Sequence, residues 1–189
     1  MTTKLTSSYN YREIETLINS IENPKHRLVL MVAYGCGLTL NEIRLLKVED
    51  VDLKRKQVFI NKCGRSSNEK IIHLEPVITN AFKSYIKYWN QTYKKQVYLF
   101  PGRNNKPYCK RAIQKIFEKA CKITDIDSKG GIHSLRCSFV AHLRREGYTL
   151  KQVKDLIGNI SYKTINTYSV KTKMKTKTIK NPISKLTLR

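Results

Sequence analysis

Apolar residues recur every three or four positions through most of the chain, which is the spacing of amphipathic helices. Asn10 and Thr39 each stand three residues before a glutamate, a pattern that predicts a capping box at the start of two helices. Proline and glycine residues bound the other periodic stretches. Helices are therefore expected over about 10–21, 24–35, 39–46, 76–89, 113–120, 134–146 and 150–157, with a last short one before Tyr168.

The hydrophobic period changes between residues 56 and 75. Residues 58–61 and 70–74 read as two short strands joined by a polar stretch that contains a glycine. No repeat period and no Ser/Gly linker is found. The sequence therefore predicts a mainly α fold with a small antiparallel β-sheet (α+β). We expect a single domain over 1–189, with a core to about residue 170 and a C-terminal tail over 171–189.

The chain has 37 Lys and Arg against 14 Asp and Glu, so its formal net charge is +23. Self-repulsion at this charge is relieved by a polyanion, which makes nucleic acid the expected partner. A membrane surface is a poor alternative, because the six lysines of residues 171–180 carry almost no amphipathic stripe. The longest apolar run has six residues, against the ~20 that a membrane span needs.

From the cysteines and the N-terminal residues, we expect a cytoplasmic protein that associates with the nucleoid. The N-terminal residues lack the apolar core of a signal peptide. The five cysteines are scattered, with no C-x-x-C pair, and are expected to be reduced thiols that form neither disulfides nor a zinc site.

Candidate chemistry lies in the last third of the chain. His133 and Arg136 stand three residues apart at a predicted helix start and therefore share a face. The segments 156–159 and 163–168, the second ending in Tyr168, follow at a characteristic interval. This order and spacing resembles the catalytic domain of the tyrosine recombinases, the phage-integrase and Xer-type family. Further segments that match the family pattern are 34–52, 98–102, 133–147 and 180–183.

The resemblance implies a DNA integrase or site-specific recombinase. Tyr168 corresponds to the nucleophile that forms a 3′-phosphotyrosyl link, Arg136 to an arginine that clamps the phosphate, and His133 to a histidine that assists proton transfer. A lysine on the small sheet normally protonates the leaving 5′-oxygen. That position falls on Arg65 if the alignment has no gap, or on Lys62 with a small gap. The family's reaction uses neither a metal nor another cofactor.

Two positions depart from the family pattern. Thr39 stands where the family has its first arginine, and Asn159 where it has a second histidine or a tryptophan. Arg44 lies five residues after Thr39, about 500° around a helix, and so points away from that position. Arginine at position 65 would also be a poor general acid, because it stays protonated. The family's N-terminal core-binding region is expected to be absent.

The matching and the departing positions together leave two possible functions. One is an enzyme that binds duplex DNA and cleaves and rejoins strands through Tyr168. The alternative is a catalytically degenerate recombinase that holds DNA or a related recombinase. The C-terminal segment also has two interpretations, an anchor on a neighbouring protomer or a segment that packs on its own domain. Its apolar residues are Met174, Ile179, Ile183 and Leu186.

Overall fold

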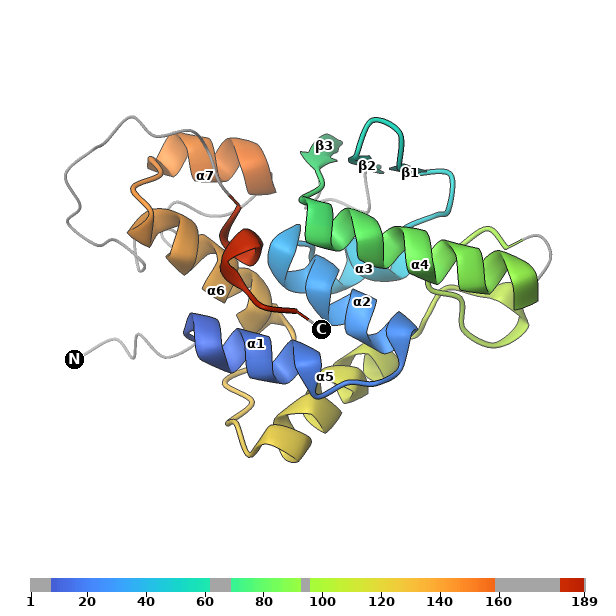
Figure 1. The fold of residues 1–189 in the computed structure, drawn as a ribbon, viewed down its shortest axis with the longest axis horizontal. Helices are drawn as coiled ribbons and strands as arrows, with labels where there is room; N and C mark the ends of the chain where they lie inside the picture. Colours follow the sequence, from blue (N-terminus) through green and yellow to red (C-terminus); the bar gives the residue numbers. More distant parts are fainter. Residues whose placement is uncertain (1–7, 62–68, 93–95, 159–180, 189) are drawn as a thin grey trace.

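The structure of the protein is a computed structural model that describes residues 8–61, 69–92, 96–158 and 181–188 (Figure 1). The helices are α1 (Tyr11–Asn19), α2 (Pro24–Gly35), α3 (Leu40–Leu45), α4 (Pro76–Thr92), α5 (Lys110–Thr124), α6 (His133–Arg145) and α7 (Leu150–Ile157). The strands are β1 (Val51–Asp52), β2 (Gln57–Ile60) and β3 (Lys70–His73), and two short 3-10 helices are η1 (Arg103–Asn105) and η2 (Pro182–Lys185). The mainly α fold with a small antiparallel sheet is confirmed.

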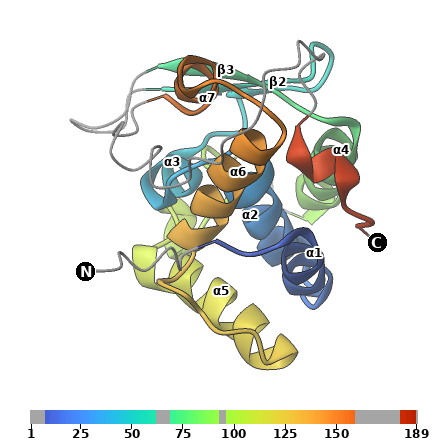
Figure 2. The ribbon, with the colours of Figure 1, turned by 90° about the vertical axis from the view of Figure 1, so that its left-hand side faces the viewer.

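Helix α2 forms the centre of the fold. Its residues from Leu28 to Gly35 are all buried, and it packs against α1, α3, α4, α5 and α6. A helix that is apolar all round is stable only when neighbours cover every side, and here they do. Figures 1 and 2 show the sheet and α7 at one end of the molecule and α5 at the other.

The helix starts lie within one residue of those that the sequence predicts, except that α5 begins at Lys110, three residues earlier than expected. Asn10 and Thr39 both form complete capping boxes, with Glu13 and Glu42 respectively. Helix α6 begins after Gly131, which has a positive φ of 82°, and ends two residues before Gly147, whose φ is 95°. The predicted helix before Tyr168 lies outside the described residues.

The sheet has three strands rather than two, in the order β1-β2-β3 with both pairs antiparallel. Val58 pairs with Val51 on one side and Ile72 on the other. Strand β1 has two residues, too short to show an alternating pattern, and it forms only because β2 offers a free edge. Along β3, Ile72 is buried while Ile71 and His73 are exposed, so Lys70 shares the inward face with Ile72.

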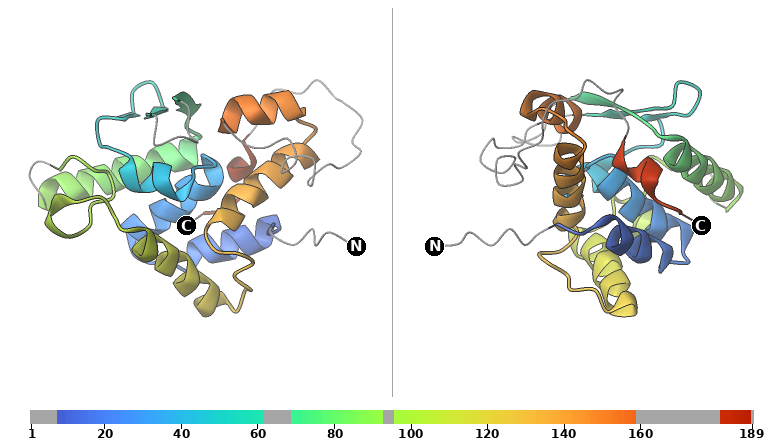
Figure 3. Two further views of the ribbon diagram at one scale, coloured as in Figure 1. Left: turned by 180° about the vertical axis from the view of Figure 1, so that it is seen from behind. Right: turned by 60° about the vertical axis from the view of Figure 1, so that its left-hand side comes forward.

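The C-terminal segment 181–188 packs on the chain's own helices (Figure 3). Ile183 is fully buried among α2, α4 and α6, and Leu186 is also buried. The side-chain amide of Asn181 donates to the carbonyl oxygen of Gly35 at 2.6 Å. Of the two interpretations of this segment, the structure therefore supports packing in cis for Ile183 and Leu186. Met174 and Ile179 lie outside the described residues.

Within the described ranges, no helix combines the length and apolar character needed to cross a bilayer.

Candidate active site

Arg136 is held in the interior by three separate segments of the chain. Its guanidinium donates to the carbonyl oxygen of Gly37 and, at 3.4 Å, to that of Ile157 at the end of α7. Its Nη1 lies 3.6 Å from Oε2 of Glu42. Only 3% of the residue is exposed, and burial lowers the pKa of the guanidinium although Glu42 opposes the shift. The side chain is therefore fixed before any ligand arrives.

Thr39 lies in the same cluster but supplies no charge. Its hydroxyl accepts a hydrogen bond from the backbone N–H of Glu42 at 3.3 Å, and its own N–H donates to Oε2 of Glu42 at 2.6 Å. Because Arg136 contacts the same carboxylate oxygen, position 39 lies beside Arg136. This position therefore offers a capping hydroxyl where the family pattern has an arginine.

Arg44 does not fill that gap. Its Nε donates to the backbone carbonyl oxygen of Tyr108, in the loop before α5, at 3.2 Å. This agrees with the expectation that it points away from Thr39.

Lys70, on β3, is a member of the cluster that the sequence analysis missed. Its Nζ lies 3.0 Å from Oε1 of Glu42 and donates to the carbonyl oxygen of Ile157 at 2.7 Å. Burial lowers the pKa of the ammonium, Glu42 opposes this shift, and Arg136 adds to it. The alternation of residues along the strand could have indicated this position, since it places Lys70 on the same face as the buried Ile72.

His133 is the first residue of α6, one turn before Arg136, and its ring is exposed. Partial desolvation of the ring, followed by the positive charge of Arg136, holds the pKa of His133 below its ordinary value. The ring is therefore neutral at pH 7, and its basic nitrogen can take up a proton.

The remaining predicted site residues are Tyr168, Asn159, Arg65 and Lys62, and all four lie outside the described residues. The nearest described position is Gly158, directly before Asn159. A side-chain Cβ at Gly158 would stand 3.5 Å from Cδ of Lys70. Gly158, at the end of α7, thus lies next to Lys70 and the cluster.

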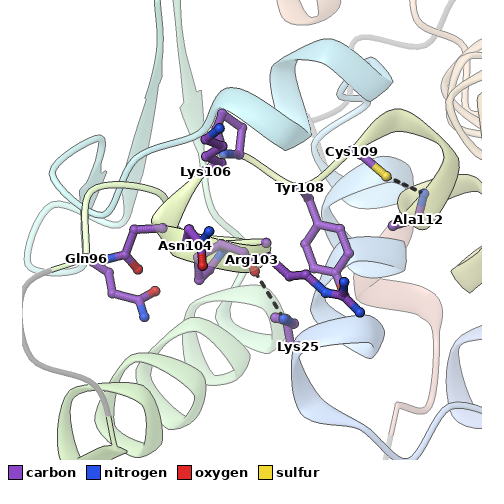
Figure 4. Close-up of a pocket in the computed structure, with 12 residues that line it drawn as sticks. Lys25, Gln96, Arg103, Asn104, Lys106, Tyr108, Cys109 and Ala112 are labelled. Carbon is purple, nitrogen blue, oxygen red and sulfur yellow. Dashed lines mark hydrogen bonds between the residues drawn. The ribbon is translucent and has the colours of Figure 1, made fainter.

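A surface pocket of about 860 Å³ lies elsewhere, around the loop that carries η1 (Figure 4). Lys25 reaches into its wall, where its ammonium donates to the carbonyl oxygen of Pro101 at 3.3 Å and stands 4.5 Å from the ring centre of Tyr108. None of the sequence-predicted catalytic residues lines this pocket. Among the described residues, no group of three His, Cys, Asp or Glu side chains could hold a metal ion.

The family model of the phage integrase family matches residues 9–175. The chain belongs to this family. Its catalytic-domain fold is that of the tyrosine recombinases, so the integrase resemblance of the motifs is confirmed.

Among curated relatives, this chain is 28% identical over 184 residues to tyrosine recombinase XerD of Halalkalibacterium halodurans, covering 92% of this chain and 61% of that protein. Tyrosine recombinase XerA of Pyrococcus horikoshii is 26% identical over 187 residues, covering 97% of this chain and 62% of the relative. The chain thus spans about three fifths of the length of these relatives.

The solved structures that match share the fold at lower identity. The crystal structure of XerA recombinase aligns with a TM-score of 0.76 and 21% identity, over 87% of this chain and 60% of that one. The XerH site-specific recombinase, bound to its difH substrate before cleavage, aligns with a TM-score of 0.73 and 22% identity. That match covers 86% of this chain and 49% of the XerH chain.

Proposed function

We propose that this chain binds duplex DNA and cleaves and rejoins its strands through Tyr168. The observation that carries the proposal is the fixed, buried position of Arg136, one turn from the exposed ring of His133. A donor held in place before the reaction stabilises developing charge without the cost of reorganisation. An arginine also matches two phosphate oxygens at once, which suits it to a phosphodiester.

The proposed step exchanges one phosphoester for another. The hydroxyl oxygen of Tyr168 attacks the phosphorus and loses its proton, which the neutral ring of His133 can accept. The bond from phosphorus to the 5′-oxygen breaks, and that oxygen takes up a proton from Lys62. Arg65, the alternative at this position, would be a poor donor because a guanidinium holds its proton. Arg136 binds the non-bridging oxygens, where negative charge grows in the transition state. Because a phosphoester replaces a phosphoester, the reverse step reseals the strand.

The charge of the chain and the nature of its relatives support duplex DNA as the substrate. A net charge of +23 favours binding to phosphates at any sequence. The XerH site-specific recombinase, which shares the fold, is bound to its difH substrate. Base contacts that select one target would come in addition to this general attraction.

The test is covalent capture on a nicked suicide duplex that carries the recognition site. We expect a protein–DNA adduct with the unaltered chain and none with Tyr168→Phe, which lacks only the hydroxyl oxygen. Arg136→Lys keeps the charge but removes the fork, so the adduct should form at least tenfold more slowly. An adduct that persists in Tyr168→Phe would disprove the assignment of the nucleophile.

Thr39 favours a second candidate, a module that binds DNA without cutting it. Its hydroxyl is used in the helix cap, so the charge that the family pattern has at this position is not supplied from position 39. If the unaltered chain gives no adduct while Thr39→Arg with Asn159→His does, the binding module is the correct function. If neither protein gives an adduct on any duplex that it binds, the cleavage proposal is wrong.

A further inference from the structure

Lys70 and Arg136 converge on the same two acceptors, although they come from β3 and α6. Each contacts one oxygen of the Glu42 carboxylate, Lys70 at Oε1 and Arg136 at Oε2. Both also donate to the carbonyl oxygen of Ile157. The ammonium and the guanidinium therefore stand on either side of one carboxylate, at the point where α7 ends.

This cluster carries an excess positive charge. Among the described residues, Glu42 is the carboxylate that forms ion pairs with these two cations. The side chains of Lys70 and Arg136 are only 7% and 4% exposed. Two buried cations around one carboxylate leave a net charge of +1, and an unpaired buried charge is costly unless an anion completes it. One phosphodiester group carries the single negative charge that would do so.

The ammonium of Lys70 also has capacity for a ligand. It has three N–H donors, and its contacts with the described residues account for two of them, one to Glu42 and one to Ile157. The third can be given to an anion that approaches beside Arg136.

Lys70 lies close to position 39, where the charge of the family pattern is lacking. The backbone N–H of Thr39 donates to the same carboxylate that pairs with Lys70 and Arg136. A cation from β3 therefore stands in the cluster where position 39 offers only a hydroxyl. We propose that Lys70 binds the reacting phosphate together with Arg136 and supplies the charge that position 39 lacks. This inference rests on the proposed function.

The test compares adduct formation by the unaltered chain, Lys70→Met and Lys70→Arg on the nicked duplex. Lys70→Met should slow the reaction by about 10²–10³-fold, the effect of losing one fixed transition-state donor, while Lys70→Arg should retain most of the rate. The double variant Lys70→Met/Thr39→Arg should recover activity, because it returns a cation to the other side of Glu42. A Lys70→Met rate within threefold of the unaltered chain would overturn the proposal, as would a folded double variant that recovers nothing.

A purely structural lysine is distinguished by stability. Lys70→Met leaves Glu42 paired with Arg136, so its unfolding midpoint should stay at or above that of the unaltered chain. Loss of the adduct together with a lowered midpoint would instead show that Lys70 only holds Glu42 in place. Lys47→Met is the matched control, because Lys47 forms a 2.9 Å pair with Glu49 at the surface. It should change neither the adduct rate nor the midpoint.

Binding of orthovanadate, an analogue of the pentavalent phosphate, tests Lys70 without strand cleavage. Orthovanadate should raise the unfolding midpoint of the unaltered chain and of Lys47→Met, but not that of Lys70→Met. If this pattern holds while no protein forms an adduct, Lys70 is an anion ligand and the cleavage proposal alone has failed. Equal rises in all three proteins would overturn the inference about Lys70.

Discussion

The hydroxyl of Tyr34 lies 2.8 Å from Nδ1 of His142, joining α2 to α6 in the fully buried interior. The ring of Tyr11 stacks on the same imidazole, with ring centres 4.0 Å apart. Burial, and next the charge of Arg145, lowers the pKa of His142 to about 4. The folded protein therefore keeps this ring neutral under all but acidic conditions.

This pair predicts a loss of stability in mild acid. Between pH 6.5 and about 4 the unfolded chain protonates His142 and the folded chain does not, so the free energy of unfolding falls as the pH falls. The expected slope from this residue is about 1.4 kcal/mol per pH unit, measured by urea unfolding. Above pH 6.5 its contribution is constant. Burial also lowers the pKa of His26 and His133, so both add in the same direction.

The share of each histidine is measured with glutamine variants. His142→Gln should remove most of the slope, while His26→Gln and His133→Gln should each remove a smaller part. An unchanged slope in His142→Gln would show that protonation of this ring does not cause the loss of stability in acid.

Glu42 is expected to be the most sensitive charged residue of the described core. Glu42→Gln leaves Lys70 and Arg136 buried beside each other without a carboxylate, which should cost roughly 3–5 kcal/mol of unfolding free energy. Adding Lys70→Met should recover part of this loss, since it removes one of the two cations. Glu49→Gln, at the exposed pair with Lys47, should leave thermal unfolding unchanged. Equal effects of the two glutamine variants would contradict the ion-pair arrangement.

The docking of the C-terminal segment should contribute strongly to stability. Ile183 is completely buried, so Ile183→Ala should cost about 2–5 kcal/mol in chemical unfolding. Lys185→Ala, two residues on, removes a partly exposed pair with Glu146 and a contact of the ammonium with the ring of Tyr11, 5.4 Å from its centre. It should cost about 1 kcal/mol, less than Ile183→Ala. If Ile183→Ala is no more damaging than Lys185→Ala, this segment does not pack on its own helices in solution.

Gly35 tests the same contact from the other side. A Cβ at this position would stand 2.5 Å from Cδ1 of Ile183 and 2.6 Å from Cδ1 of Ile78. Gly35→Ala should therefore lower the unfolding midpoint, although alanine normally favours a helix. Shortening the facing side chain in Gly35→Ala/Ile183→Val should restore part of the loss, giving a measurable coupling between the two sites. Strictly additive effects would argue against the contact.

Binding to duplex DNA should depend steeply on salt. A protein that neutralises ~6–10 phosphates loses about 10³–10⁵ in affinity between ~50 and 200 mM salt. Tyr168→Phe is the suitable form for fluorescence anisotropy, because it has the same charge and cannot form the proposed covalent link. A flat salt response would remove duplex DNA as the main partner.

Local sequence signals predicted most of the helices because their determinants are a few residues apart. The cap of Thr39 and Glu42 closes over three residues, and the same is true of Asn10 and Glu13. His133 and Arg136 share one turn of α6, so their closeness also followed from spacing alone. Strand β1 escaped prediction because its two residues are ordered by hydrogen bonds to β2 and not by their own pattern.

The sequence by itself determined the fold class, the family and the line of candidate residues from His133 to Tyr168, since these depend on composition, periodicity and motif order. Only the tertiary structure decided that Lys70 joins Arg136 around Glu42, and that Ile183 fills the space above Gly35. Both are contacts between residues far apart in the chain, fixed by how whole helices and strands pack. The missing charge at Thr39 is visible in the sequence itself. The nearby position of Lys70, which contacts the same carboxylate, depends on where the fold places β3 relative to α3.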